Sequence, residues 1–282
     1  MQTATDIVQA RALFDRLPRP LGFVPTMGAL HAGHLQLIRA ARAGCAAVGV
    51  SVFVNPLQFA ASEDLAAYPR DVEGDRKKLA GAGVDALFAP DAAAMYPSGF
   101  TTFVDVGRVG TTFEGIVRPE HFRGVATVIA KLLHVVRPNA LYLGQKDAQQ
   151  TAVLRKMVRD LEFPVDVEIV PTVRESDGLA MSSRNAYLNA EQRAGAASLH
   201  RALVGLRETL ERGGSKADAV AAARSILSRL AVPDYFDVVD ADTFEPVAGL
   251  EPPAFVIGAA RFGGTRLIDN LHVTGSDPGN PA

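Results

Sequence analysis

Residues 21–35 read LGFVPTMGALHAGHL, and this stretch joins a short apolar strand to the start of a helix. Two imidazoles, His31 and His34, and two glycines, Gly28 and Gly33, come together where that helix begins. A helix N-terminus carries unpaired backbone N–H groups and the positive end of the helix dipole, so it attracts phosphate. Glycine lets the backbone approach a ligand closely, and histidine donates hydrogen bonds to charge that develops on phosphate. The stretch therefore predicts a nucleotide site.

Strand-like and helix-like runs alternate over the first two thirds of the chain. Strands are expected at residues 21–24, 47–54, 84–89, 140–143 and 165–170, and helices at residues 33–43, 69–82, 121–136 and 147–161. This α/β alternation predicts a Rossmann-like parallel sheet with helices on both faces. Ligands bind outside the carboxyl ends of such strands, and His31, Asn55 and Gly144 each follow an expected strand. One edge of the sheet is therefore expected to hold all three.

The pattern changes after about Ser176. Helices are expected at residues 190–213 and 215–230, and short antiparallel strands at residues 236–240, 254–260 and 265–270. We expect residues 1–175 to form a nucleotide-binding Rossmann-like domain and residues 176–282 a smaller C-terminal α+β domain. The tail from about residue 274 is rich in Gly, Pro and Ser and is expected to be disordered.

Composition narrows the class of protein. The chain has 282 residues, of which 48% are hydrophobic and 21% charged, so a large core is possible. Its net charge of −2 lacks the basic excess of a nucleic-acid binder, and no nucleic-acid partner is expected. Cys45 is the one cysteine, which excludes an intramolecular disulfide and suits the cytoplasm. Residues 1–17 lack the apolar core of a signal peptide, so none is expected there. Asn55, Pro56 and Gln58 interrupt the uncharged run at residues 44–62, so no membrane partner is expected.

Five short clusters carry side chains suited to nucleotide or acid chemistry, and each also has an ordinary structural interpretation. In the first, at residues 25–34, His31 and His34 are either helix caps or phosphate ligands. An H-x-x-H pair also chelates zinc, but no cysteine or obvious carboxylate completes such a site, so no metal site is expected. The second, residues 53–59, places Asn55 and Gln58 in an Asn-Pro turn, where they either shape the turn or bind a small substrate. The third is residues 68–70, in which Tyr68 precedes a helix start.

The last two clusters supply cations. Residues 143–150 place Lys146 and Asp147 at the start of a helix, where Asp147 either caps the helix or binds ribose, and Gln150 has the spacing of a capping box. Residues 181–185, MSSRN, form a loop of small hydroxyl side chains and one guanidinium, which suits a triphosphate. A plain Ser-rich loop before a helix is the alternative.

Together, these clusters resemble the pantothenate synthetase (pantoate–β-alanine ligase) family over most of the chain. The resemblance covers residues 25–34, 53–59, 68–70, 121–125, 143–147 and 181–185, in the family's order. The H-x-G-H motif alone is shared with a wider nucleotidyltransferase superfamily, whereas the combined set is highly specific. The resemblance implies ATP-dependent condensation of pantoate with β-alanine to pantothenate, through a pantoyl adenylate, with release of AMP and pyrophosphate. It also implies a homodimer.

The resemblance further implies a role for each matching residue. The implied catalytic residues are His34, as proton donor, with His31, Lys146 and Arg184. The implied ATP contacts are Met27, Gly28, His31, His34, Gly144, Lys146, Asp147, Val173, Met181, Ser182, Ser183 and Arg184. The implied contacts to pantoate and the small-substrate pocket are Gln58, Gln150, Asn55 and Tyr68. No covalent nucleophile is needed, because orientation and charge stabilisation carry such a reaction.

The segment after residues 68–70 departs from the family pattern. Some members place an acidic cluster there that is assigned to Mg²⁺, whereas this chain reads DVEGDRKK at residues 71–78. Gly74 and Lys78 weaken a protein-held site, so Mg²⁺ is expected mainly on the ATP phosphates.

Two other functions stay open at this point. One is an H-x-G-H enzyme that adenylylates a phosphorylated, pantetheine-like substrate, although such an acceptor would call for cations where Gln58 and Gln150 stand. The other is a nucleotide-sensing module, which would bind ATP and form no AMP.

Overall fold

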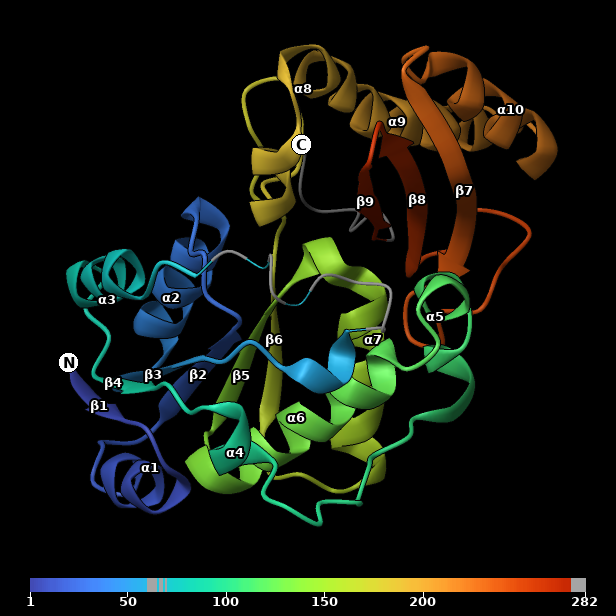
Figure 1. Cartoon of the computed structure of the whole chain (residues 1–282). Helices are drawn as coiled ribbons and strands as arrows, with labels where there is room; N and C mark the ends of the chain where they lie inside the picture. Colours follow the sequence, from blue (N-terminus) through green and yellow to red (C-terminus); the bar gives the residue numbers. More distant parts are fainter. Residues whose placement is uncertain (60–64, 66–67, 69, 275–282) are drawn as a thin grey trace. The chain divides into compact units, whose positions relative to one another are not determined.

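The computed structural model describes residues 1–59, 65, 68 and 70–274 (Figure 1). Contacts divide the chain into two compact units, one of Met1–Gln145 with Gln149–Val173, the other of Lys146–Ala148 with the chain from Arg174 onward. That these units fold as the independent domains expected on either side of residue 175 stays a prediction. The expected disordered tail beyond residue 274 and Pro69 lie outside the described residues.

A six-stranded parallel sheet forms the centre of the first unit, with the strand order β1-β4-β3-β2-β5-β6. The strands are β1 (Gln2–Ala4), β2 (Leu21–Thr26), β3 (Ala47–Val52), β4 (Ala86–Phe88), β5 (Ala140–Gly144) and β6 (Asp166–Val170). The five expected strands are present, and the expected parallel sheet is confirmed. The sequence analysis did not predict β1, because three residues are too few to show a period.

Helices cover both faces of this sheet. They are α1 (Ile7–Phe14), α2 (Ala32–Gly44), α3 (Val72–Gly81), α4 (Ala92–Met95), α5 (Glu114–Val117), α6 (His121–Val136) and α7 (Ala148–Asp160), with 3-10 turns η1 (Pro56–Gln58), η2 (Gly107–Gly110) and η3 (Gln145–Asp147). Ile38 of α2 and Leu79 of α3 join the core cluster on the face that includes Val24. On the other face, Phe14 of α1 packs edge-on against Phe23. Phe23 and Val24 are neighbours on β2, so their side chains point to opposite faces of the sheet. Helix α1 therefore covers one face, and α2 and α3 cover the other.

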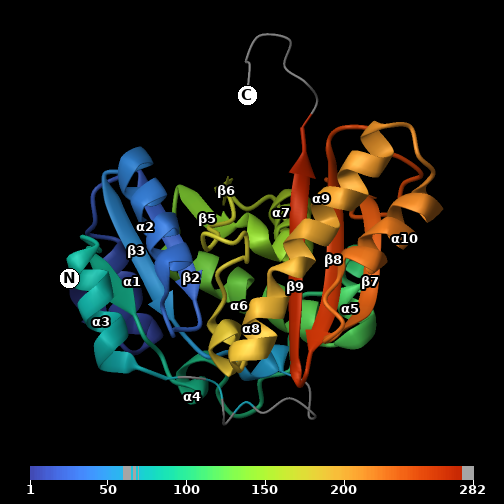
Figure 2. The same cartoon turned by 90° about the horizontal axis from the view of Figure 1, so that it is seen from above.

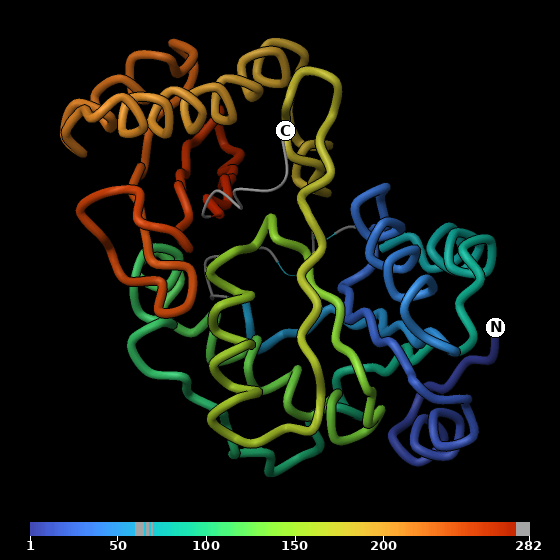
Figure 3. Tube along the Cα trace, turned by 180° about the vertical axis from the view of Figure 1, so that it is seen from behind, coloured from blue at the N-terminus to red at the C-terminus, as the bar shows by residue number. Residues whose placement is uncertain are grey.

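The second unit is an antiparallel sheet covered by helices. Its elements are η4 (Ser183–Tyr187), α8 (Ala190–Ala196), α9 (Ser198–Glu211), α10 (Lys216–Ile226), β7 (Ala231–Asp240), β8 (Ala254–Phe262) and β9 (Thr265–Val273). The strand order is β7-β8-β9, so β9 is an edge strand. Helices α9 and α10 lie side by side and pack on the sheet (Figures 2 and 3). The expected α+β architecture is confirmed.

Several boundaries differ from the expected ones. The single helix expected at residues 190–213 is two helices, with the break at Ala197. Strand β7 begins five residues before the expected start, since a register shift between Pro233 and Tyr235 interrupts its alternation. Helix α3 begins at Val72 after an Asp71 cap, rather than at residue 69. Within the described residues, no helix combines the length and apolar character needed to cross a membrane.

The sheet order places a ligand site at a definite position. Strand β2 lies between β3 and β5, and the chain changes its direction of strand addition between β2 and β5. In such sheets the crevice beside this switch point holds the ligand, outside the carboxyl ends of the strands. Because β3, β2 and β5 run parallel, the segments that begin at Met27, Phe53 and Gln145 leave the sheet at one edge.

Candidate active site

The two histidines of the H-x-G-H motif cap helix α2 reciprocally. Gly33 N donates to His31 Nδ1 over 3.2 Å, and His31 N donates to His34 Nδ1 over 3.3 Å. A Cβ on Gly33 would lie 2.9 Å from His31 Cε1, so a larger residue there would displace the capping ring of His31. Helix capping is thus confirmed, and it also fixes the tautomers. With each Nδ1 accepting a backbone proton, Nε2 carries the ring proton in the neutral imidazole.

A buried carboxylate holds the loop that leads to these histidines. Gly28 and Ala29 have φ values of 85° and 52°, a left-handed conformation that is strained for alanine. Asp75 of α3 is 2% exposed, and its two carboxylate oxygens accept from Ala29 N and Leu30 N, each over 2.8 Å. Lys78 Nζ donates to Leu30 O over 2.8 Å. Helix α3 therefore fixes the backbone of the loop between β2 and α2.

This arrangement does not fit a protein-held Mg²⁺ on the acidic segment of α3. Both Asp75 oxygens accept backbone N–H groups, and Asp71 Oδ1 accepts from Gly74 N over 2.9 Å as a helix cap. In the part of the chain that the structure describes, no group of three or more His, Cys, Asp or Glu side chains is arranged to hold a metal ion.

The amides after β3 form a buried network. Asn55 is 1% exposed, and its Nδ2 donates to Gln58 Oε1 over 3.0 Å and to Gly124 O over 3.1 Å. Its Oδ1 accepts from Leu57 N and from the Tyr96 hydroxyl, over 3.3 and 2.7 Å. All four hydrogen-bonding positions of Asn55 are thus in use, two within the turn and two toward Tyr96 and Gly124. The turn interpretation of the Asn-Pro cluster is thus confirmed for Asn55, which also orients the amide of Gln58, whereas binding of a small substrate stays a prediction.

Gln58 presents a donor at the edge of the sheet. Its Oε1 accepts from Asn55, and its Nε2 lies 3.2 Å from Met27 Sδ, on the neighbouring loop. A thioether is a weak acceptor, so this N–H group changes partner at little cost. The structure thus brings Met27, Asn55 and Gln58, three of the expected site residues, into direct contact.

Helix α6 and Arg118, which precedes it, support the same turn, and no role was predicted from the sequence for these supporting residues. His121 Nδ1 donates to Gln58 O over 2.9 Å, and Arg118 Nη2 donates to the same oxygen over 3.1 Å. A Cβ on Gly124 would lie 2.2 Å from Leu57 O, so only glycine permits this approach of α6. The motif at residues 121–125 includes Gly124 and could have pointed to this contact. The partner Asn55, however, lies 69 residues away in sequence, so the motif alone does not identify it.

The other expected residues of the first unit lie at or after strand ends, on α7 and, for Tyr68, between η1 and α3. Gly144 ends β5, and a Cβ placed there would meet nothing within 4 Å. Val173 follows β6 by three residues. Buried Gln149 bonds to Val109 O and Thr112 O, and its neighbour Gln150 is half-buried. Tyr68 packs edge-on against Phe59, with ring centroids 5.8 Å apart.

A cavity of about 390 Å³ opens beside the same loops. Met27, Gly28 and Pro56 line it from the ends of β2 and β3, together with Asp75 and Arg70. Its walls are largely apolar, so the edge of the sheet offers a space that excludes water from part of a small ligand.

The expected cationic residues belong to the second unit. Lys146 Nζ lies 3.2 Å from Asp147 Oδ1, and the Lys146 side chain is 18% exposed. In the Ser-rich loop, Arg184 N donates to Ser182 Oγ over 3.2 Å, and Met181 and Ser183 are half-buried. Asn185 Nδ2 donates to Ala180 O over 3.1 Å, which closes the loop between them. The roles of all these residues toward ligands stay predictions.

Comparison with known proteins agrees with this architecture. Residues 2–272 match the family model for pantoate–β-alanine ligase. The pantothenate synthetase of Chloroflexus aurantiacus is 50% identical over 279 residues, with 98% of each chain covered. A crystal structure of pantothenate synthetase from Thermus thermophilus has a TM-score of 0.93 and 51% identity, covering 98% of this chain and 100% of that one.

A third relative was solved with ligands. The pantoate–β-alanine ligase of Francisella tularensis, complexed with β,γ-ATP and β-alanine, has a TM-score of 0.81 and 33% identity, covering 96% of this chain and 97% of that one. The family match over residues 2–272, together with relatives about 50% identical over nearly the whole chain, shows that this chain belongs to the pantoate–β-alanine ligase family, a family of enzymes.

Proposed function

We propose that this chain joins pantoate to β-alanine in two steps through a pantoyl adenylate, with ATP as the third substrate. In the first step a carboxylate oxygen of pantoate attacks the α-phosphorus of ATP, and the bond to the bridging oxygen breaks to release pyrophosphate. In the second, the amine of β-alanine attacks the acyl carbon. The amide C–N bond forms, the amine loses a proton, and AMP leaves. Adenylation is needed because a free carboxylate is a poor acyl donor.

The observation that carries this proposal is the reciprocal histidine cap beside the switch point of the sheet. His31 and His34 use Nδ1 for the cap, so Nε2–H is the ring group that each would offer to a phosphate. Donors held in advance stabilise charge that grows on phosphate oxygens without reorganising during the reaction. The dipole of α2 adds to the same field. His34 is the proposed proton donor, a role in which its imidazole carries protons on both nitrogens and Nδ1 gives up the bond from His31 N.

The remaining nucleotide contacts are proposed from the family resemblance. Lys146 and Arg184, with Ser182 and Ser183, would neutralise the triphosphate, and Met181 would lie beside them. Gly144 and Asp147 would face the ribose, Val173 the adenine, and Met27 and Gly28 the nucleotide. The ATP analogue in the Francisella tularensis ligase supports ATP as the nucleotide. Mg²⁺ is proposed to bind through the phosphates and water, since the acidic segment of α3 serves other contacts.

The acid substrate is proposed to bind at the amide turn. Gln58 Nε2 would exchange the weak Met27 contact for a pantoate oxygen, and Gln150 would donate to the same substrate. Asn55 would act mainly by holding Gln58, and Tyr68 would line the pocket. Neutral amides suit a substrate without a phosphate, which favours pantoate over a phosphorylated acceptor. The cytoplasm and a homodimer remain the expected location and assembly.

A pyrophosphate-release assay tests the proposal. ATP, Mg²⁺ and pantoate without β-alanine should release about one pyrophosphate per active site, because the adenylate stays bound. Adding β-alanine should start steady turnover, with AMP and pantothenate in equal amounts. Release that continues with pantoate alone would favour an adenylyltransferase, and ATP binding without AMP would favour a nucleotide-sensing module.

A further inference from the structure

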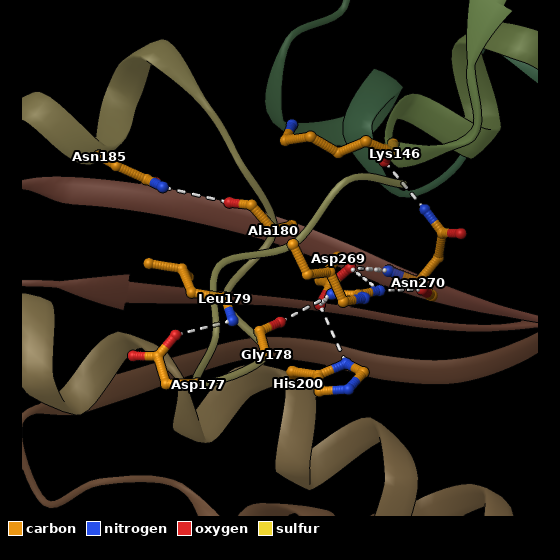
Figure 4. A network of polar contacts seen from close by, with 10 residues as sticks. Lys146, Asp177, Gly178, Leu179, Ala180, Asn185, His200, Asp269 and Asn270 are labelled. Carbon is orange, nitrogen blue, oxygen red and sulfur yellow. Dashed lines mark hydrogen bonds and ion pairs between the residues drawn. The ribbon is translucent and has the colours of Figure 1, made fainter. Parts of the chain in front are cut away.

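Strand β9 carries two adjacent buried polar side chains that the proposed chemistry does not use. Asp269 is 4% exposed and Asn270 is 2% exposed, although β9 is an edge strand. Successive side chains of a strand point to opposite faces, so these two leave β9 on opposite sides. Figure 4 shows the pair between Lys146 on one side and His200 on the other. Buried polar side chains are normally hydrogen-bonded, and Asp269 and Asn270 each make such bonds.

Asn270 bonds to the backbone that carries the proposed phosphate lysine. Its Nδ2 donates to Lys146 O over 2.9 Å, a contact between residues 124 apart in sequence. The bond fixes the main chain at Lys146 and does not involve the ammonium group of that lysine. A displacement of this carbonyl would move the origin of the Lys146 side chain.

Asp269 holds the segment that leads into the Ser-rich loop. Arg174 Nη1 and Nη2 donate to its two carboxylate oxygens over 2.7 and 3.0 Å, a bidentate ion pair. The same guanidinium donates to Gly178 O and to Asn270 O, each over 3.1 Å. Four hydrogen bonds from one Arg174 thus tie the turn at Gly178 to the edge of β9. His200 Nδ1 lies 3.6 Å from Asp269 Oδ2 and completes the surroundings of the carboxylate.

The turn held in this way continues directly into the proposed phosphate loop. Arg174 pairs with Ala180 in an antiparallel bridge, and Gly178 adopts a φ of 91° beside His200. Ala180 is then joined to Asn185 by the bond that closes the Ser-rich loop. The contacts therefore run without interruption from Asp269 to both ends of residues 181–184.

We propose that Asp269 and Asn270 are positioning residues for the ligation reaction, which together set the spacing between Lys146 and the loop that bears Arg184. The inference rests on the proposed roles of Lys146 and Arg184 at the triphosphate. Two cations on separate segments stabilise one transition state only if their spacing is fixed, because displacements of about 1 Å already cost rate. Strand β9 supplies that fixed spacing through one hydrogen bond on one face and one ion pair on the other.

The test begins with Asn270→Asp, which replaces the donor to Lys146 O by an acceptor of the same size. We expect kcat/KM for ATP to fall about tenfold or more, while KM for pantoate stays within about twofold. Asn189→Asp is the matched control, since it makes the same chemical change at an exposed helix cap where aspartate serves equally well. An Asn270→Asp enzyme with wild-type kcat/KM for ATP would overturn the proposal.

A double-mutant cycle separates positioning from general damage to the fold. In a Lys146→Ala background, Asn270→Asp should lower kcat/KM for ATP by less than about threefold, because the group it positions is gone. Equal factors in both backgrounds would overturn the inference, since loss of folded protein acts equally in each. If Lys146→Ala alone keeps wild-type kinetics, the proposed role of Lys146 fails first and this inference with it.

Two further variants keep the test decisive. If circular dichroism shows that Asn270→Asp does not fold, Asn270→Ser replaces it, because the shorter hydroxyl cannot span to Lys146 O and adds no buried charge. The second half of the proposal is tested by Asp269→Asn in wild-type and Arg184→Ala backgrounds. The proposal is supported if Asp269→Asn lowers kcat/KM for ATP strongly in the wild-type background and only slightly in the Arg184→Ala background. Equal factors in the two backgrounds overturn it.

Discussion

Single atoms decide the geometry of the amide turn, and Gly124 is the clearest case. Its missing side chain lets α6 contact the main chain of Leu57, where a Cβ would lie 2.2 Å from the carbonyl oxygen. Gly124→Ala should therefore displace the turn, cost about 1–3 kcal/mol of stability and raise KM for pantoate about tenfold. Steady-state kinetics and thermal unfolding measure the two effects. Gly81→Ala, on α3 with nothing within 4 Å, is the matched control and should behave as wild type.

Asp75 holds the loop before His31, a role that its hydrogen bonds to Ala29 N and Leu30 N reveal and its residue type alone does not. Asp75→Asn replaces one acceptor oxygen by an amide N–H that faces a backbone N–H, so we expect a loss of about 1–3 kcal/mol of stability. Turnover should fall as well, since the loop before His31 loosens. Thermal unfolding and kcat report these changes, and Glu73→Gln, exposed on the same helix, is the control. If Asp75 is instead a Mg²⁺ ligand, the variant will keep its melting temperature and recover activity at high Mg²⁺.

At the scale of elements, α2 combines a structural cap with the proposed chemistry. His34→Gln separates them, because glutamine at this position of a capping box keeps an acceptor for His31 N but has no titrating imidazole. We expect an unchanged melting temperature and a fall in kcat of about 100-fold or more. His34→Ala would lose both functions, which makes it the weaker test. A His34→Gln enzyme with nearly wild-type turnover would exclude His34 as the proton donor.

The elements also show what the sequence predicts and where prediction stops. Helix α6 was predicted with its observed bounds, since its apolar period of 3.6 is a local signal. Strand β2 and the start of α2 at the H-x-G-H motif were predicted as well, because their signals also lie within a few neighbouring residues. Contacts between distant segments leave no such signal. Asp75 reaches Leu30 across 45 residues and Asp269 reaches Arg174 across 95, so their roles required the structure. The break at Ala197 also lacks a proline to mark it, and Gly195, two residues earlier, lies inside α8.

At the scale of the whole molecule, the buried Asp269 predicts how stability responds to acid. Burial alone would raise the pKa of Asp269, but its interactions with His200 and Arg174 outweigh that effect and lower the pKa below its usual range. A lowered folded-state pKa gives stability that is present above the unfolded pKa of about 3.9 and lost as the pH falls through the folded value. Asp269→Asn should therefore melt below wild type at pH 7, with the difference shrinking between pH 5 and pH 3. A difference that stays constant with pH would contradict this.

The whole account depends on activation of pantoate as an adenylate, and one isotope measurement tests that step. Pantoate labelled with ¹⁸O in its carboxylate is incubated with the enzyme, ATP, Mg²⁺ and β-alanine, and the nucleotide product is analysed by mass spectrometry. We predict one labelled oxygen in the phosphate of AMP, because the acyl oxygen stays on phosphorus when the amine displaces AMP. Unlabelled AMP, or ADP with labelled inorganic phosphate, would contradict the account.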